Sequence, residues 1–225
     1  MRLKTTPICI ALFFVGFLLT TSLEARSQCK LNVSAVDSQT GSVIQADKYE
    51  LVNHSTLKST IKTSMSGIAA FEYPKDSKCS LKVKKQGFWT SVSRVPDDCT
   101  SSPAIWSVKT YPGESTKEVF ILDWTPTYDA DGKVNFDAKW VWALGVSWPR
   151  PASAPPPGCE TDCTITVDID IDTNGDVTNA KARTGNPNFW KSASKAAIKS
   201  KFRPVLFNGR FVPVKTVMTY VFGRT

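Results

Sequence analysis

The stretch TVDIDIDTNGDV, residues 166–177, decides how the C-terminal third of the chain folds. Its letters fit two patterns. Asp170, Asp172 and Asn174 stand at alternate positions before Gly175, as in the opening of an EF-hand calcium loop. The same stretch also alternates polar and apolar residues before a turn, which is typical of a β-hairpin.

The closing position of the loop decides between the two patterns. An EF-hand needs a bidentate carboxylate at its twelfth position and a helix on either side, but the twelfth residue counted from Asp170 is Lys181. The upstream flank repeats with a period of two, which a helix does not sustain. Asn174 and Gly175 form a pair that accepts the positive φ of a tight turn. We therefore expect a hairpin here, and neither a metal nor a cofactor.

The residues after the hairpin predict a helix and a last strand. The return strand 177–183 ends at a Thr-Gly-Asn-Pro break, and Pro187 and Pro204 suit the entry and the end of a helix. A second Asn-Gly turn at 208–209 precedes an alternating strand over 212–222. The expected order is β, β, α, β. One helical face would collect Phe189, Ala193, Ala196, Ala197 and Ser200.

The N-terminal part reads as short strands separated by polar turns, without a helical period. Such spacing predicts a small all-β sandwich. The segments D-x-x-T-G from Asp37, G-x-x-x-F from Gly67 and L-x-V-x-x-x-G-F from Leu81 resemble the carboxypeptidase regulatory-like, or prealbumin-like, family. That resemblance implies a fold and no activity. The expected strands are 31–37, 48–53, 67–73, 80–88 and 118–124.

Residues 125–158 combine tryptophans with prolines. Trp140, Trp142 and Trp148 precede a run with prolines at 149, 151, 155, 156 and 157. Because proline is incompatible with a helix interior or a central strand, we expect this run to be a stiff, extended connector. We expect its tryptophans to pack against the domains that it joins. The predicted fold class is therefore two domains: an N-terminal all-β sandwich over 28–124 and a C-terminal α+β ββαβ domain over 159–225.

Residues 1–27 have the features of a secretory signal peptide. Arg2 and Lys4 precede an apolar run over 7–23, and small residues follow it. The alternative is a membrane anchor that is retained, because the run reaches the lower length limit of a spanning helix. Either way we expect an exported protein of the periplasm or cell envelope of a Gram-negative bacterium.

The net charge of +8 falls to +6 without residues 1–27, which hold three basic residues and one acidic residue. The basic residues are dispersed, with KVKK at 82–85 as the densest group, so the charge indicates solvated faces and no nucleic-acid partner.

Five cysteines follow the predicted signal peptide. An oxidising compartment favours their pairing. Cys159 and Cys163 are close enough in sequence for a local disulfide, and Cys79 with Cys99 would join a strand to the loop after it. Cys29 then remains free or alternatively paired. A zinc site is not expected, since the sequence has one histidine and no Cys-x-x-Cys.

The C-terminal residues together resemble a known family. The SWP tripeptide at 147–149, the hairpin from 165, the small-residue helix, KFRPVLFNGRFVPV at 201–214 and TVMTYVF at 216–222 are similar to the C-terminal domain of TonB, the periplasmic part of an energy transducer. The resemblance begins at 147 and implies that the last strand receives an extended segment of an outer-membrane receptor. By position, the partner-binding residues are Trp148, Pro149, Val214, Thr216, Met218, Thr219, Tyr220 and Phe222.

The sequence thus predicts an envelope protein that binds a partner, an outer-membrane receptor or another envelope protein, by β-strand addition, within TonB-dependent transport. Side chains such as Thr216, Met218 and Tyr220 would select the partner. One alternative is a complete transducer with a retained anchor beside an inner-membrane motor, although no long Pro-rich spacer is present. Another is a structural, peptidoglycan-associated protein. No catalytic residues are predicted, because His54 is the lone histidine and no nucleophile motif occurs.

Overall fold

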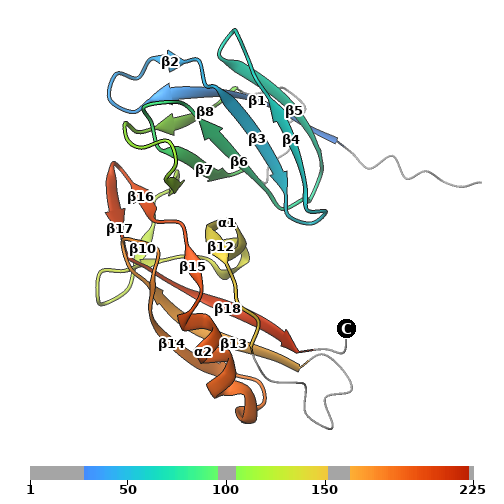
Figure 1. Cartoon of the computed structure of the whole chain (residues 1–225), viewed down its shortest axis with the longest axis vertical. Helices are drawn as coiled ribbons and strands as arrows, with labels where there is room; N and C mark the ends of the chain where they lie inside the picture. The colour runs from blue at the N-terminus through green and yellow to red at the C-terminus, as the bar shows by residue number, and fades with distance from the viewer. Residues whose placement is uncertain (1–27, 96–104, 152–162, 223–225) are drawn as a thin grey trace, which may run out of the picture.

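The computed structural model describes residues 28–95, 105–151 and 163–222. These residues are β-rich and form several sheets and two short α-helices. Figure 1 shows two lobes along the long axis: the N-terminal strands form one, and the C-terminal strands with α2 form the other. The small elements α1 and β12 lie where the two lobes meet (Figure 1).

Two sheets build the N-terminal lobe. In a four-stranded sheet, β2 and β5 pair antiparallel with β1, and β8 pairs with β1 in parallel. A seven-stranded sheet has the order β17-β16-β9-β7-β6-β3-β4. The bounds of their N-terminal strands are β1 Gln28–Asp37, β2 Val43–Ile44, β3 Lys48–Asn53, β4 Lys58–Lys62, β5 Ile68–Pro74, β6 Cys79–Lys84, β7 Thr90–Arg94, β8 Ile105–Thr110 and β9 Glu118–Ile121.

Alternation along these strands creates the core between the sheets. Val33 and Phe71 from the four-stranded sheet and Tyr49, Leu81 and Val83 from the seven-stranded sheet are fully buried in one cluster. The five strands predicted from the sequence overlap β1, β3, β5, β6 and β9. The sequence prediction missed β2, β4, β7 and β8. In β4 every side chain is exposed, so the sequence there has no apolar alternation to recognise.

The C-terminal lobe contains a five-stranded sheet of order β10-β11-β18-β13-β14. The predicted hairpin is confirmed, since β13 pairs antiparallel with β14. The turn differs in detail: Gly175 has a positive φ of 89°, whereas Asn174 is not left-handed. The strands are β10 Thr127–Tyr128, β11 Val134–Asn135, β13 Cys163–Ile171, β14 Val177–Thr184 and β18 Val214–Phe222.

The helix α2 (Trp190–Ile198) covers one face of β13 and β14. It follows a 3-10 turn, η2 (Pro187–Phe189), that Asn186 caps by accepting a hydrogen bond from the Asn188 backbone. The predicted apolar face is confirmed. The helix ends before Pro204, because β15 (Lys201–Phe202) already begins at 201. The residues buried from this face are Phe189, Ala193, Ala196, Ala197 and Ser200.

The two lobes share a sheet and a core. The hairpin β16 (Val205–Phe207) and β17 (Arg210–Val212) belongs by sequence to the C-terminal part, yet β16 pairs in parallel with β9 of the N-terminal sheet. Figure 1 shows this hairpin reaching towards the N-terminal lobe. Phe120 on β9 also lies in the same buried cluster as residues of the C-terminal sheet. The lobes are therefore not independent packing units.

Residues 125–151 are structured, where the sequence predicted an extended connector. They form β10, β11, a 3-10 turn η1 (Ala138–Trp140), α1 (Val141–Leu144) and β12 (Gly145–Ser147), which pairs with β15. Trp140 and Leu144 are buried in the shared core. The prolines that suggested an extended run are concentrated after 148, and residues 152–158 lie outside the described residues.

Candidate functional site

The last strand, β18, is the longest strand of the C-terminal sheet together with β13. It pairs with β13 along its whole length, from Val214 opposite Ile171 to Phe222 opposite Cys163, without a shift in register. One edge of β18 is therefore fully used. The backbone N–H and C=O groups of its even-numbered residues point towards β13, because the C=O groups of Pro213 and Lys215 point the other way, towards β11.

Within the described residues, the other edge of β18 is paired with another strand only at its start. The short strand β11 pairs in parallel with Val214 and Lys215. The Phe136 N–H donates to the carbonyl of Lys215 over 2.8 Å, so the Lys215 backbone faces away from β13. Because backbone direction alternates along a strand, the N–H and C=O groups of Val217, Thr219 and Val221 face the same way. Within the described residues, no strand pairs with them.

The side chains of β18 follow the same alternation. Val214, Thr216, Met218, Tyr220 and Phe222 are buried, while Thr219 is exposed and Val221 is 62% exposed. This corrects the prediction that Thr216, Met218 and Tyr220 select a partner, since these side chains point into the core. In the same core the tilted rings of Phe222 and Phe189 pack with 4.8 Å between their centroids. Of the predicted strand residues, Thr219 alone is presented to solvent.

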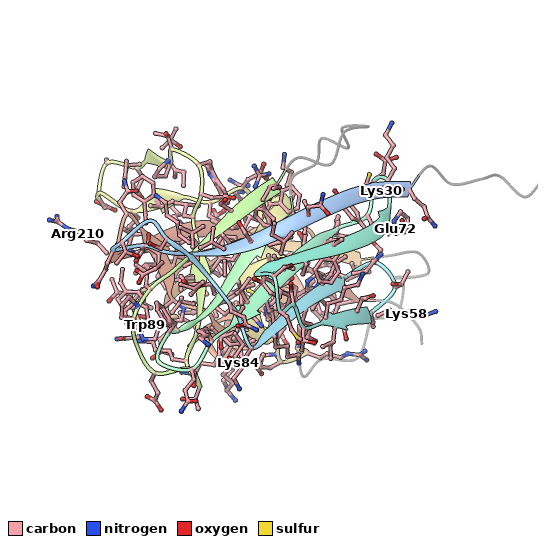
Figure 2. The ribbon with its side chains drawn as sticks, turned by 90° about the horizontal axis from the view of Figure 1, so that it is seen from above. Lys30, Lys58, Glu72, Lys84, Trp89 and Arg210 are labelled. Atoms are coloured by element: carbon pink, nitrogen blue, oxygen red, sulfur yellow. The ribbon has the colours of Figure 1, made fainter. Side chains whose placement is uncertain are left out.

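Two other edge strands differ from β18 in charge. The strand β4 ends the seven-stranded sheet with Lys58 and Lys62, and Figure 2 shows Lys58 projecting outward. The strand β14 ends the five-stranded sheet with Lys181 and Arg183. Charged residues at an edge oppose the addition of another strand. From 216 to 222, β18 has no charged residue, and its threonines, valines and aromatics favour strand pairing.

The predicted binding residue Trp148 lies elsewhere. Its ring packs over Gly145 and lies 6.3 Å from the ring of Phe202. It lines a groove of about 540 Å³ between the lobes, together with His54 and Trp142, and no residue of β18 lines that groove. The structure therefore does not bring Trp148 and its neighbour Pro149 into one site with β18.

Arg203, which also lines this groove, connects several of the surrounding elements by hydrogen bonds. The guanidinium of Arg203 donates to Glu118 at 2.7 and 2.6 Å, and to the carbonyls of Ala143 and Gly145 at 3.1 and 2.7 Å. Burial raises the pKa of Glu118, but the nearby charges of Arg203 and Lys82 outweigh it and leave the pKa below its ordinary value. Arg203 thus joins β9, α1 and β12 to β15.

His54 lies beside this arginine. Its Nε2 and the Ser80 hydroxyl form a hydrogen bond of 2.8 Å, and its ring centroid is 4.1 Å from that of Trp142. Burial, then the charges of Arg203 and Lys82, lower its pKa to about 4. The imidazole is therefore neutral at neutral pH. His54 directly follows β3 of the N-terminal lobe, and Trp142 and Arg203 from the later part of the chain leave it half-buried.

The acidic residues of the β13–β14 hairpin are held by neighbours. Asp170 pairs with Lys133 at 3.0 Å, Asp168 with Arg183 at 3.6 Å, and Asp176 with Lys201. Asp172 accepts backbone hydrogen bonds across the turn. The part of the chain that the structure describes contains no group of three metal-binding side chains.

The cysteines correct one predicted pairing. Cys79 is a buried free thiol whose pKa burial raises to about 11, so the predicted disulfide between Cys79 and Cys99 is wrong. Cys29, which the sequence left free or alternatively paired, is disulfide-bonded. The predicted pair Cys159–Cys163 stays a prediction, because Cys159 and the side chain of Cys163 lie outside the described residues.

The signal peptide predicted over 1–27 also lies outside the described residues. None of the helices in the described ranges is long and apolar enough to span a bilayer.

Comparisons with known proteins give no family. No protein-family model and no curated protein matches the chain. Solved structures with a weak likeness include the pilus 2b backbone protein of group B streptococcus, with 16% identity and a TM-score of 0.28 over 38% of this chain and 41% of that one. The Bacillus anthracis TIE protein has 10% identity and a TM-score of 0.30 over 87% of this chain and 27% of that one.

The pilus backbone protein RrgB of Streptococcus pneumoniae has 10% identity and a TM-score of 0.26 over 89% of this chain and 52% of that one. The chain thus spans between about a quarter and a half of the length of these three proteins. A likeness of this degree says nothing about what the protein does.

Proposed function

We propose that this protein binds an extended segment of a partner by β-strand addition to the open edge of β18, at Val217, Thr219 and Val221. The observation that carries the proposal is the unpaired edge itself. It presents an uncharged stretch of a long strand in which one side of the backbone is already fixed by β13. An incoming strand would extend the five-stranded sheet where β11 stops.

The buried side of β18 supports this role. Met218 and Thr216 are 1% and 4% exposed, so the strand is held in place by core packing rather than by a partner. A preformed edge loses little conformational freedom on binding. Its three outward residues offer three donors and three acceptors, each hydrogen bond worth ~1 kcal/mol net, so strand addition gives reversible rather than permanent association.

The side chains nearest the edge set the preference for a partner. Thr219 and Val221 are exposed on the face opposite α2, and Lys215 lies at the end next to β11. A segment with β-branched residues opposite Val221 fits this surface. In line with the TonB resemblance, the partner is a periplasmic segment of an outer-membrane receptor, and the protein acts in the cell envelope.

Amide hydrogen exchange tests the proposal residue by residue. The probes are synthetic peptides that tile the periplasmic N-terminal segments of outer-membrane receptors from the same organism. A peptide that adds to β18 slows exchange at the amides of Val217, Thr219 and Val221. The amides of Met218 and Tyr220 are already paired with β13 and change little.

A proline variant supplies the functional control. Thr219→Pro removes an outward donor and obstructs an incoming strand, yet breaks no hydrogen bond to β13. We expect it to fold and to lose peptide binding, whereas Thr219→Ala keeps the backbone donor and binds nearly as well as the parent. If a folded Thr219→Pro binds the same peptide at parent strength, strand addition at this edge is wrong.

A further inference from the structure

A second cavity lies where the two lobes meet, away from β18. Its volume is about 410 Å³, within the range of about 300 to 1,000 Å³ that is usual for small-ligand sites. It lies among the ends of β7, β8, β9 and β16, so both lobes contribute to it. Four aromatic side chains line it, all partly exposed: Trp106, Tyr111, Trp124 and Phe207.

One of these aromatic rings is fixed before any ligand binds. The guanidinium carbon of Arg94 lies 4.6 Å from the ring centroid of Trp124 and 4.9 Å from that of Trp140. Phe120 and Phe136 contact Trp124 at centroid distances of 6.2 and 5.7 Å. Cation–π and aromatic contacts of this kind hold the indole in one orientation. The remaining exposed part of Trp124 is therefore a rigid wall of the cavity.

Polar side chains surround the aromatic wall. Asn208 is at the turn between β16 and β17, where φ values of 48° at Asn208 and 79° at Gly209 define a tight turn. This turn places Asn208 at the cavity. Asp123 and Lys109 carry opposite charges, so the rim offers a strongly ionic ligand no net attraction. The exposed polar residues of the rim are Ser107, Lys109, Asp123, Thr125 and Asn208.

We infer that this cavity is a saccharide-binding site. The C–H face of a pyranose ring carries partial positive charge and packs on the electron-rich face of an aromatic ring. Its hydroxyls need donors and acceptors of both kinds, which the carboxylate of Asp123, the amide of Asn208 and the ammonium of Lys109 supply. Phosphorylated ligands fit less well, because the opposite charges of Asp123 and Lys109 give an anion no net attraction. The site is independent of the proposed strand addition.

The test uses saturation-transfer difference NMR with the full chain. The probes are tetra-N-acetylchitotetraose and cellotetraose, with a neutral, end-capped pentapeptide for comparison. We expect saturation of the ring C–H protons of one or both saccharides and none of the pentapeptide. No transfer to either saccharide at millimolar concentration overturns the inference, and so does transfer to the pentapeptide instead.

Three variants locate the binding. Asn208→Gly removes the amide and keeps the left-handed backbone that glycine accepts, and Asp123→Asn removes the charge without a change of shape. Each should weaken saccharide binding about tenfold. Asp131→Asn, a matched change at an exposed aspartate outside the cavity, should bind as the parent does. Undiminished binding by both cavity variants refutes the site.

A separate control distinguishes this site from the edge of β18. The Thr219→Pro protein should bind the saccharide as tightly as the parent, because no residue of β18 lines the cavity. If Thr219→Pro loses saccharide binding while it remains folded, the saccharide binds at the edge and the inference is wrong.

Discussion

The neutral state of His54 links the junction of the two lobes to pH. In the folded protein its pKa is about 4, whereas an unperturbed histidine has a pKa of 6.5. The folded state thus binds this proton less readily than the unfolded state. The stability that His54 contributes is fully present above pH 6.5 and is lost as the pH falls from about 6.5 towards 4.

The magnitude follows from the two values. At 1.36 kcal/mol for each tenfold change in proton affinity, the difference corresponds to a loss of ~3 kcal/mol between pH 7.5 and pH 4. His54 is half-buried, so this figure is an upper estimate. The physical cause is first the burial of the imidazole, which opposes its charged form, and then the nearby positive charges of Arg203 and Lys82.

The variant His54→Gln isolates the effect. Glutamine retains a polar group within reach of Ser80 but does not titrate, and it loses the ring contact with Trp142, which is worth ~1 kcal/mol. At pH 7.5 the variant should be less stable than the parent. As the pH falls to 4.5, the parent should lose this advantage and become the less stable of the two.

The assay is urea unfolding of both proteins at closely spaced pH values. The carboxylates, including Glu118, titrate in both proteins and cancel in the difference between them. Parallel stability curves for parent and variant from pH 7.5 to 4.5 would show that His54 does not titrate as its surroundings require, and would refute the reasoning.

Three further predictions concern the rest of the molecule. In the described residues Cys79 is the free thiol, and its burial and its pKa of about 11 protect it from reaction. A thiol reagent should therefore label Cys79 only after unfolding. Labelling of the native protein by a neutral reagent within minutes contradicts this prediction. Arg203→Lys should lower the free energy of unfolding by about 2 to 3 kcal/mol, because a lysine cannot bond to Glu118 and to two carbonyls at once. Thermal unfolding measures this loss, and a loss below about 0.5 kcal/mol contradicts the prediction. Millimolar calcium should leave the melting temperature unchanged, because Lys181 occupies the closing position of the apparent loop; a rise of several degrees contradicts it.

The sequence predicted the C-terminal elements well where local rules were sufficient. The hairpin β13–β14, the buried face of α2 and the strand β18 follow from periodicity and from glycine and proline positions. These signals act over a few residues, so no distant contact was needed to recognise them. The N-terminal sandwich strands with clear alternation were recognised for the same reason.

The candidate site was only partly predictable. Periodicity placed β18 at the end of the chain, but not the direction in which each side chain points, and so the buried Thr216, Met218 and Tyr220 were assigned to the partner. The two-residue strand β11, which covers the start of the edge, is too short to give any periodic signal. Trp148 was grouped with β18 by resemblance, whereas its contacts place it at another surface.

By itself the sequence determined the local elements and the alternation of their faces, because hydrophobic periodicity and turn residues act between near neighbours. The tertiary structure alone decided the pairing of β9 with β16, the burial of His54 beside Arg203 and the aromatic cavity between the lobes. Each of these depends on contacts between segments about 80 or more residues apart. Local propensity does not determine which of several sheet edges such a segment pairs with. Which edge remains open in a folded protein is set by the strands that have already paired, and so it is decided only when the whole sheet has formed.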